Sequence, residues 1–289
     1  MKYGVILALL VAILWSLVEV EYTKIYKKID RSNIYFYQFF TRTIIYFLTV
    51  VIFDASIISS FNSEKLFVFL PIVLCDLIAS VVINFAVVNG KLSVVSPIMA
   101  SYPALDIIFG LLILGEKMDI LTIVLVNVIA LSIVVLASNS KKNDSSPHFL
   151  IGIFFAFIYT FLIAFSTIFE KNVYNLSYSV YEFYYYKSLI YFLVSILFAL
   201  VIFVSPVKIK RPTKDILKGS VLTPLGNVLY SFAISFGNVI VVTPVSSIYS
   251  MFTSIMSTRV LKERLSLKEK VCISLIIFST IVLVIANLI

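Results

Sequence analysis

The stretch Ser93–Pro103 reads SVVSPIMASYP, and 147 residues later the stretch Ile240–Ser250 reads IVVTPVSSIYS. Both copies hold two valines, a proline and a tyrosine at the same places, and each lies inside a long apolar run. Proline removes a backbone donor and strains a helix that contains it. Its presence at matched places in two apolar runs therefore indicates that the chain contains an internal duplication.

The duplication extends beyond these two stretches. The shift of 147 also aligns NFAVVNGKLSVVSP at 84–97 with SFAISFGNVIVVTP at 231–244. A shift of 145 aligns the second apolar run of each half, in the pairs Arg42 with Lys187 and Tyr46 with Tyr191. Because the register changes by only two residues across a half, the repeat covers most of the chain.

The composition places the chain in a membrane. Of the 289 residues, 61% are hydrophobic and only 13% are charged, and the mean hydropathy is +1.07. A helix needs about 20 apolar residues to cross the hydrocarbon core, and ten segments meet this requirement. They are 4–23, 33–53, 66–89, 93–114, 119–138, 149–170, 180–204, 217–236, 239–261 and 266–288.

The fold class that we predict is an all-α integral membrane protein with ten transmembrane helices in two inverted five-helix repeats. One polar segment interrupts the apolar runs near the middle of the chain, so we divide it into a first repeat at 1–138, a linker at 139–148 and a second repeat at 149–289. Five spans are an odd number, so the two repeats must cross the bilayer in opposite senses. Secondary transporters use such inverted repeats, with the solute site at the midplane.

The duplicated run resembles the EamA-like branch of the drug/metabolite transporter superfamily. The resemblance rests on the Phe-Ala pair, the glycine and the Ser/Thr-Pro of each copy, followed by a tyrosine and then by LGEKMD or LKERLS. Trp15, followed by Ser16, resembles the tryptophan of that family's first helix, whereas Ile163 stands at the corresponding place in the second half. The resemblance implies a transporter of amino acids, nucleotide sugars, choline-like amines or other metabolites, with both termini in the cytoplasm.

Polar residues at membrane depth indicate where a cavity lies, because a charge there costs at least about 2.5–3.5 kcal/mol unless protein or water surrounds it. Helical spacing puts Glu19 and Glu170 on inward faces of the first and sixth spans, although both are near enough to helix ends to reach the interface. Arg42 and Lys187 supply matched cations. In the third and eighth spans, Asp76, Ser80 and Asn84 correspond to Thr223, Asn227 and Ser231.

In the fourth and ninth spans Tyr102 and Asp106 correspond to Tyr249 and Thr253. Asp76 and Asp106 either face the cavity or form structural ion pairs with the two cations. Asn84 and Asn227 either contact substrate or bond neighbouring helices. The aromatic residues form an interfacial belt or, through Trp15, Tyr102, Tyr184 and Tyr249, a wall suited to an organic cation.

The predicted substrate-binding residues are Trp15, Glu19, Arg42, Asp76, Ser80, Asn84, Tyr102, Asp106, Glu170, Lys187, Asn227 and Tyr249. Four acids stand against two bases, which favours a zwitterionic or cationic solute, amino-acid- or amine-like, or protons. We therefore predict a secondary transporter working by alternating access in the cell membrane. The alternatives are a channel-like pore and a lipid-translocating bundle.

The sequence contains no glycine-rich phosphate loop, no Cys/His metal spacing and no nucleophile beside a histidine, so we expect no cofactor, metal or enzymatic activity. The net charge of +8 is spread over membrane-edge loops, which favours anionic lipids over nucleic acid. Twenty of the Lys and Arg residues lie in loops, 16 on one face and 4 on the other, and the positive-inside rule then places both termini outside. This disagrees with the cytoplasmic termini that the resemblance implies, and we favour the charge count. A monomer and a homodimer are both compatible with the sequence.

Overall fold

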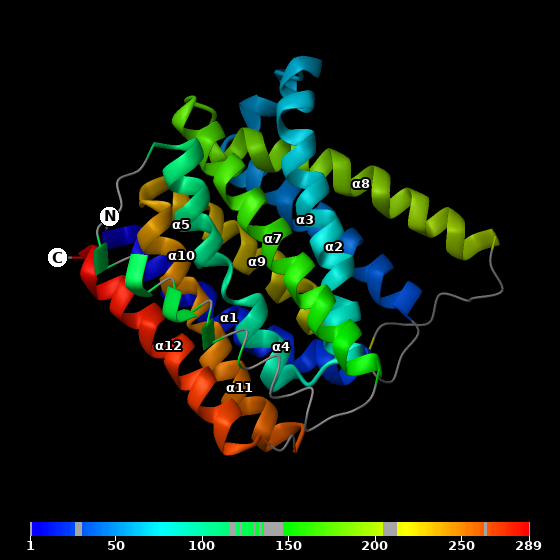
Figure 1. Ribbon diagram of the computed structural model, residues 1–289. Coiled ribbons are helices and arrows are strands. Elements are labelled where there is room, and N and C mark those ends of the chain that lie inside the picture. Colours follow the sequence, from blue (N-terminus) through cyan, green and yellow to red (C-terminus); the bar gives the residue numbers. More distant parts are fainter. Residues whose placement is uncertain are drawn as a thin grey trace.

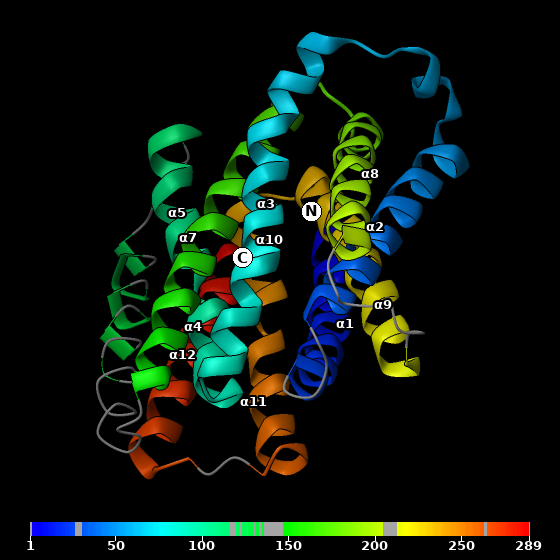
Figure 2. The ribbon, with the colours of Figure 1, turned by 90° about the vertical axis from the view of Figure 1, so that its right-hand side faces the viewer.

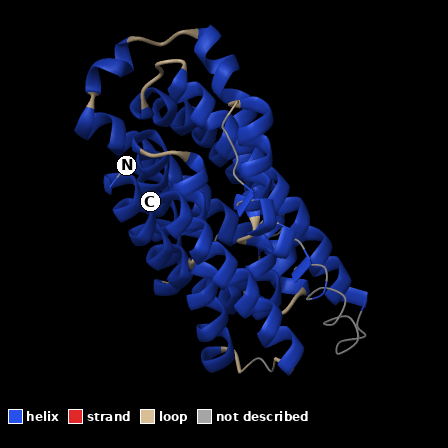
Figure 3. Ribbon diagram, turned by 60° about the vertical axis from the view of Figure 1, so that its left-hand side comes forward, coloured by secondary structure: helices blue, strands red, loops and turns tan. Residues whose placement is uncertain are grey.

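The structure is a computed structural model, and it describes residues 2–26, 31–115, 120–121, 123–125, 127–129, 131–132, 135, 147–204, 213–262 and 265–288. Every regular element in this part of the chain is helical (Figures 1 and 3). The first half contains α1 (Lys2–Tyr26), α2 (Arg31–Phe53), the short 3-10 helix η1 (Ala55–Ser59), α3 (Ser63–Asn89), α4 (Leu92–Met99) and α5 (Tyr102–Ile113). The second half contains α7 (Pro147–Asn175), α8 (Val180–Val204), α9 (Lys214–Phe236), α10 (Val239–Ser247), α11 (Tyr249–Val260) and α12 (Leu267–Leu288).

Seven segments among the described residues are long and apolar enough to cross a membrane, which confirms a multi-pass helical membrane protein. The predicted spans 217–236 and 266–288 are helical as α9 and α12 but are not among the seven. Part of the predicted span 119–138 lies outside the described residues, as do Glu116 and Glu263 of the repeated motif. The count of ten spans therefore stays a prediction.

Side-chain caps fix several helix starts. Ser179 and Glu182 form a reciprocal pair at the start of α8, in which Ser179 N–H donates to Glu182 Oε2 at 2.9 Å and Glu182 N–H donates to Ser179 Oγ at 3.0 Å. Ser266 and Glu269 repeat this arrangement at the start of α12, at 2.7 and 3.3 Å. Both are S-x-x-E sequences, and this capping box satisfies donors that a helix start otherwise leaves unpaired.

The fourth and ninth predicted spans are each broken into two half-helices. The first half-helices, α4 and α10, contain Pro97 and Pro244 at their sixth residues, and each ends within a few residues of its proline. The predicted span limits, with starts near Ser93 and Val239, place both prolines near a first turn, where little hydrogen bonding is lost. That placement is wrong, because both prolines stand in the second turn. A proline in the second turn removes a real intrahelical bond and crowds the carbonyl four residues back, and the helix stops soon after it.

Backbone groups near the breaks find partners inside the protein. Ile98 O accepts from Ser101 Oγ at 2.6 Å and from Thr160 Oγ1 of α7 at 2.9 Å. Near the second break, Ser246 Oγ donates to Thr243 O at 2.9 Å. The broken spans are also the most covered ones. Within an apolar stretch of 18 residues in each span, 78% of the residues are buried in Leu92–Ile113 and 67% in Val239–Val260, against 33–50% in the other five candidate spans. Irregular backbone is tolerated at membrane depth only under such cover.

The helices of the two halves pack in exchanged pairs. The first helix of one half lies against the third helix of the other, as α1 with α9 and α3 with α7, and the two second helices, α2 and α8, lie together. The half-helices also exchange, because α4 contacts α11 while α5 contacts α10. Figures 1 and 2 show the α5 and α10 pair towards one end of the bundle and the α4 and α11 pair towards the other.

Two glycine pairs allow the closest of these crossings. A Cβ placed on Gly152 of α7 would lie 2.5 Å from Gly90 N and 2.7 Å from Gly90 Cα, at the end of α3. A Cβ on Gly4 of α1 would lie 3.3 Å from Gly237 Cα, at the end of α9. Gly90 and Gly237 correspond at the shift of 147, so the same contact is made twice. Small residues allow helix backbones to approach in this way.

A matched turn follows the second half-helix of each half. Gly115, after α5, has φ of 66°, and Lys262, after α11, has φ of 56°. These positions also correspond at the shift of 147. A lysine in the left-handed region is uncommon, so the chain keeps this turn in the second half without the glycine that favours it.

The outer surface of the bundle is apolar. Large side chains such as Phe154, Leu193 and Phe278 are each at least 61% exposed. Lipid tails cover such a surface in a membrane protein. The two ends of the described chain lie near each other (Figures 1 and 3).

We predict that Gly152→Ala destabilises the protein by about 1–3 kcal/mol, because the added methyl group would overlap the backbone of Gly90 and overpacking costs this much. Unfolding by SDS titration in detergent micelles measures the effect. Ile151→Ala, at a neighbouring exposed position of α7, is the control. Equal stability of Gly152→Ala and the wild type would contradict the close crossing.

Candidate functional site

A cavity of about 120 Å³ lies in the middle of the bundle and is lined from both halves of the chain. Its walls come from α1, α2, α3, α7, α8 and α9, with the first residues of α5 and α11. Ten of the twelve predicted site residues line it, namely Trp15, Glu19, Arg42, Asp76, Ser80, Tyr102, Glu170, Lys187, Asn227 and Tyr249.

Asn84 and Asp106 do not line the cavity, although both are fully buried. Asn84 donates from Nδ2 to Ser80 O at 3.1 Å, so it bonds its own helix one turn back. Asp106 lies one turn beyond Tyr102, where α5 is covered by α7 and α10. Both were predicted as substrate-binding residues, with helix-to-helix bonding as the alternative for Asn84 and an ion pair as the alternative for Asp106, and neither lines this cavity.

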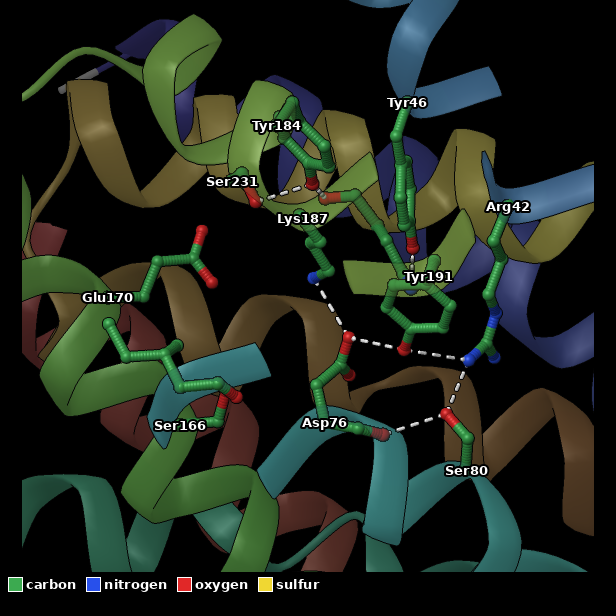
Figure 4. A network of polar contacts seen from close by, with 12 residues as sticks. Arg42, Tyr46, Asp76, Ser80, Ser166, Glu170, Tyr184, Lys187, Tyr191 and Ser231 are labelled. Atoms are coloured by element: carbon green, nitrogen blue, oxygen red, sulfur yellow. Dashed lines mark hydrogen bonds and ion pairs between the residues drawn. The ribbon is translucent and has the colours of Figure 1, made fainter. Parts of the chain in front are cut away.

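Lys187 of α8 forms an ion pair with Asp76 of α3, at 2.8 Å between Nζ and Oδ2. Figure 4 shows the lysine reaching towards Asp76, with Glu170 on its other side. Lys187 Nζ also lies 4.8–5.6 Å from the ring centroids of Phe183, Tyr46 and Tyr184, close enough for cation–π attraction. Only 3% of Lys187 is exposed, so Asp76 supplies the charge that makes its burial tolerable.

Arg42 of α2 lies on the other side of Tyr191 (Figure 4). Its Nη1 donates to Ser80 Oγ and, at 3.2 Å, to the Tyr191 hydroxyl. The Tyr191 hydroxyl in turn donates to Asp76 Oδ2 at 3.2 Å. A connected network therefore joins the two cations through one tyrosine and one carboxylate.

Two further carboxylates face the cavity, one from each half. Glu19 of α1 accepts a hydrogen bond from Ser96 Oγ at 2.6 Å, and Ser96 directly precedes Pro97 in α4. Glu170 of α7 accepts from the Tyr174 hydroxyl at 2.6 Å. Both are more than nine-tenths buried, and no ion pair joins either of them within the part of the chain that the structure describes. Both side chains are therefore covered by protein.

Aromatic rings form one wall of the cavity. The Trp15 indole lies 5.2 Å from the ring centroid of Tyr230 and 5.8 Å from that of Tyr249. A Cβ on Gly226 would approach Trp15 Nε1 to 2.6 Å, so the glycine provides room for the indole. Tyr184, which we also predicted for this wall, does not line the cavity, and its hydroxyl lies 2.7 Å from Ser231 Oγ.

The two broken spans contact each other at the cavity. Tyr102, the first residue of α5, has its hydroxyl 2.7 Å from Ser246 Oγ of α10. Tyr249 is likewise the first residue of α11. The two tyrosines of the repeated stretch thus begin the second half-helices and point into the same cavity.

Several cavity residues were missed from the sequence, including Tyr22, Gln38 and Tyr230. Helical spacing could have identified Tyr22 and Gln38 as cavity residues, since each lies three or four residues from a predicted site residue. The same spacing applies to Tyr230, which lies three residues after the predicted Asn227. Among the described residues no group of three or more His, Cys, Asp or Glu side chains could hold a metal.

We predict that Asp76→Asn destabilises the protein by about 3–5 kcal/mol, because it leaves Lys187 buried without its counter-charge. The double variant Asp76→Asn/Lys187→Met should recover most of that loss, since methionine fills the space between the rings without a charge. SDS-induced unfolding of both variants measures the effect. A double variant no more stable than Asp76→Asn would contradict this account of the ion pair.

Comparison with known proteins identifies the family. Residues 2–138 and 150–285 each match the EamA-like transporter family. A solved crystal structure is similar over 98% of this chain and 98% of its own, with a TM-score of 0.66 and 12% sequence identity, which is a similarity of fold. No curated protein sequence matches. The two family matches together cover most of the chain, which therefore belongs to the EamA-like family of the drug/metabolite transporter superfamily, a family of membrane transporters and not of enzymes.

Proposed function

We propose that the protein is a secondary transporter in the cell membrane that carries a small zwitterionic or cationic metabolite, amino-acid- or amine-like, by alternating access. One observation carries the proposal. A central cavity is lined by both halves of the chain and holds buried side chains of both charges beside an aromatic wall. A site for a small polar solute requires such convergent polar groups within a largely apolar enclosure.

An inverted repeat would explain how the cavity opens to each side in turn. The exchanged packing supports it, because α4 lies against α11 and α5 against α10, so the two broken spans run in opposite directions past each other. The two glycine contacts support it as well, since each joins the start of one half's first helix to the end of the other half's third helix. Rocking of one repeat against the other would then expose the same residues to either side.

The charges of the cavity favour a solute with a positive group. Three carboxylates, Glu19, Asp76 and Glu170, line the cavity with two cations, Arg42 and Lys187, so the ionised set carries 3 − 2 = 1 excess negative charge. Asp76 and Lys187 neutralise each other. An ammonium group would compensate Glu19 or Glu170, and the rings of Trp15 and Tyr249 would add cation–π attraction.

We expect saturable counterflow of one class of solute when the purified protein is reconstituted in proteoliposomes. Vesicles loaded with unlabelled amino acids or amines should accumulate the labelled solute transiently. Tyr249→Ala should lower this flux at least tenfold, because Tyr249 lines the cavity and supports the Trp15 ring. Phe154→Ala, at an exposed position of α7, should leave the flux unchanged.

Two outcomes would favour the alternatives. Flux that rises linearly with solute concentration and ignores solute identity would indicate a channel-like pore. Movement of labelled lipids between leaflets without solute counterflow would indicate a lipid-translocating bundle. Either result would contradict transport by alternating access.

Proton coupling is part of the proposal, and Glu19 is its proposed carrier. Asp76 is held in an ion pair and Asp106 lies off the cavity, whereas Glu19 lines the cavity and bonds Ser96 beside the break in α4. Glu19→Gln should abolish the response of uptake to an imposed pH gradient while it preserves counterflow, which needs no gradient. Glu170→Gln is the matched control, and it should keep the response. Wild-type uptake that ignores the pH gradient would contradict proton coupling.

A further inference from the structure

The two buried cations of the cavity occupy equivalent places. Arg42 and Lys187 correspond at the shift of 145, and so do Tyr46 and Tyr191. Each cation lies over the tyrosine of the opposite helix, with Arg42 Cζ 5.6 Å from the Tyr191 centroid and Lys187 Nζ 5.3 Å from the Tyr46 centroid. The two tyrosine rings meet each other at 5.6 Å. The tyrosine that faces each cation therefore repeats where α2 meets α8.

The carboxylate partner does not repeat. Lys187 pairs with Asp76 of α3, and the residue that corresponds to Asp76 at the shift of 147 is Thr223 of α9. Thr223 also lines the cavity, and α2 packs against α9 as α8 packs against α3. The second half therefore has a side chain at the position equivalent to Asp76, but that side chain is uncharged.

Arg42 is correspondingly left with unused hydrogen-bonding capacity. It is 95% buried, since only 5% is exposed, and no ion pair joins it within the described ranges of the chain. Nη1 donates to Ser80 and Tyr191, while the Nε–H is buried and has no hydrogen-bond partner among the described residues. A guanidinium stays charged in proteins and binds carboxylates through two parallel N–H groups.

We infer that Arg42, with Thr223 lining the same cavity from α9, is the subsite for a carboxylate of the transported solute. The solute's carboxylate takes the place beside Arg42 that Asp76 takes beside Lys187. This inference rests on the proposed function and narrows it, because an amine without a carboxylate leaves the subsite empty. It also fixes the orientation of the solute, with its carboxylate against the second helix of the first half.

A single carboxylate together with an ammonium group suits the remaining charges. Glu19 and Glu170 line the same cavity of about 120 Å³, and they would repel a dianion. An ammonium group on the same small molecule would instead face one of these two acids. The site therefore selects a zwitterion over either of its singly charged analogues.

A matched ligand series tests the subsite directly. Leucine, isoamylamine and 4-methylpentanoate share an apolar group and differ in whether the carboxylate, the ammonium or both are present. Their affinities are measured by isothermal titration to the full chain in nanodiscs. We expect leucine to bind at least tenfold more tightly than isoamylamine.

The substitution Thr223→Asp restores the carboxylate that the first half has in Asp76. It should weaken leucine binding at least tenfold and leave isoamylamine binding unchanged or tighter, because the new carboxylate occupies the subsite. Thr223→Asn, of the same size and without charge, should retain the wild-type preference. An unchanged ratio of leucine to isoamylamine affinity in Thr223→Asp would overturn the inference.

A second variant and a simple probe separate this inference from the proposed function. Arg42→Lys keeps the positive charge but loses the two parallel N–H groups of the guanidinium. It should weaken the binding of leucine more than the binding of isoamylamine, and equal effects on both affinities would count against the subsite.

Propionate should raise the melting temperature of the wild type more than equimolar chloride does, and this difference should vanish in Thr223→Asp. If propionate behaves so while proteoliposomes show no counterflow, the proposed function fails and the subsite stands. If counterflow of leucine persists with the same preference in Thr223→Asp, the subsite fails and the proposed function stands.

Discussion

The constraint on which the rest of the structure depends is that backbone groups at membrane depth must find partners inside the protein. Two proline-broken spans would violate it at the lipid surface. The chain meets the constraint by burying both of them more deeply than any other candidate span and by supplying hydroxyls such as that of Thr160 to the carbonyl Ile98 O. The other helices are arranged around these two spans, and the glycine pairs bring α3 onto α7 and α1 onto α9 to enclose them.

The cavity follows from the same arrangement. Each break starts a new half-helix at a tyrosine, so Tyr102 and Tyr249 both enter the space between the halves. The residue before Pro97 is Ser96, and its hydroxyl holds Glu19. The two proline breaks, whose backbone groups must be buried, therefore also position an aromatic pair and an acidic group at the site. Bending at either break would move those groups together with the backbone.

Sequence could predict the scaffold and most of the cavity wall because both depend on periodicity. Apolar length located the helices, and helical phase with the internal shift placed ten of twelve predicted residues on the cavity. It failed where a residue's access to the cavity depends on which neighbouring helices cover it. Asp106 follows Tyr102 by one turn of the same helix, yet Tyr102 lines the cavity and Asp106 is buried where α5 packs against α7 and α10.

The partners of the charged groups were also beyond the sequence, for a related reason. Asp76 had two candidate cations at matched positions, and only the three-dimensional arrangement assigns it to Lys187, with Tyr191 linking it to Arg42. Periodicity identifies which face of a helix a residue occupies, but it does not give the rotation of that helix against a neighbour from the other half. Hydroxyl partners such as Ser96 are even harder to predict from the sequence, since serine and threonine side chains bond their own helix as readily as a neighbouring one.

In a carrier built from two similar halves, features that repeat and charges that do not repeat serve different purposes. Motion needs the halves to be alike, because each must be able to take the position of the other about the site. Recognition needs them to differ, because identical half-sites would bind a solute equally well in two opposite orientations. Here the glycine contacts, the breaks and the tyrosines beneath the cations repeat, whereas Asp76 and Thr223 do not. At the proposed subsite, the difference between Asp76 and Thr223 gives the cavity a direction, since Asp76 neutralises Lys187 whereas Thr223 leaves Arg42 available to the carboxylate of a solute.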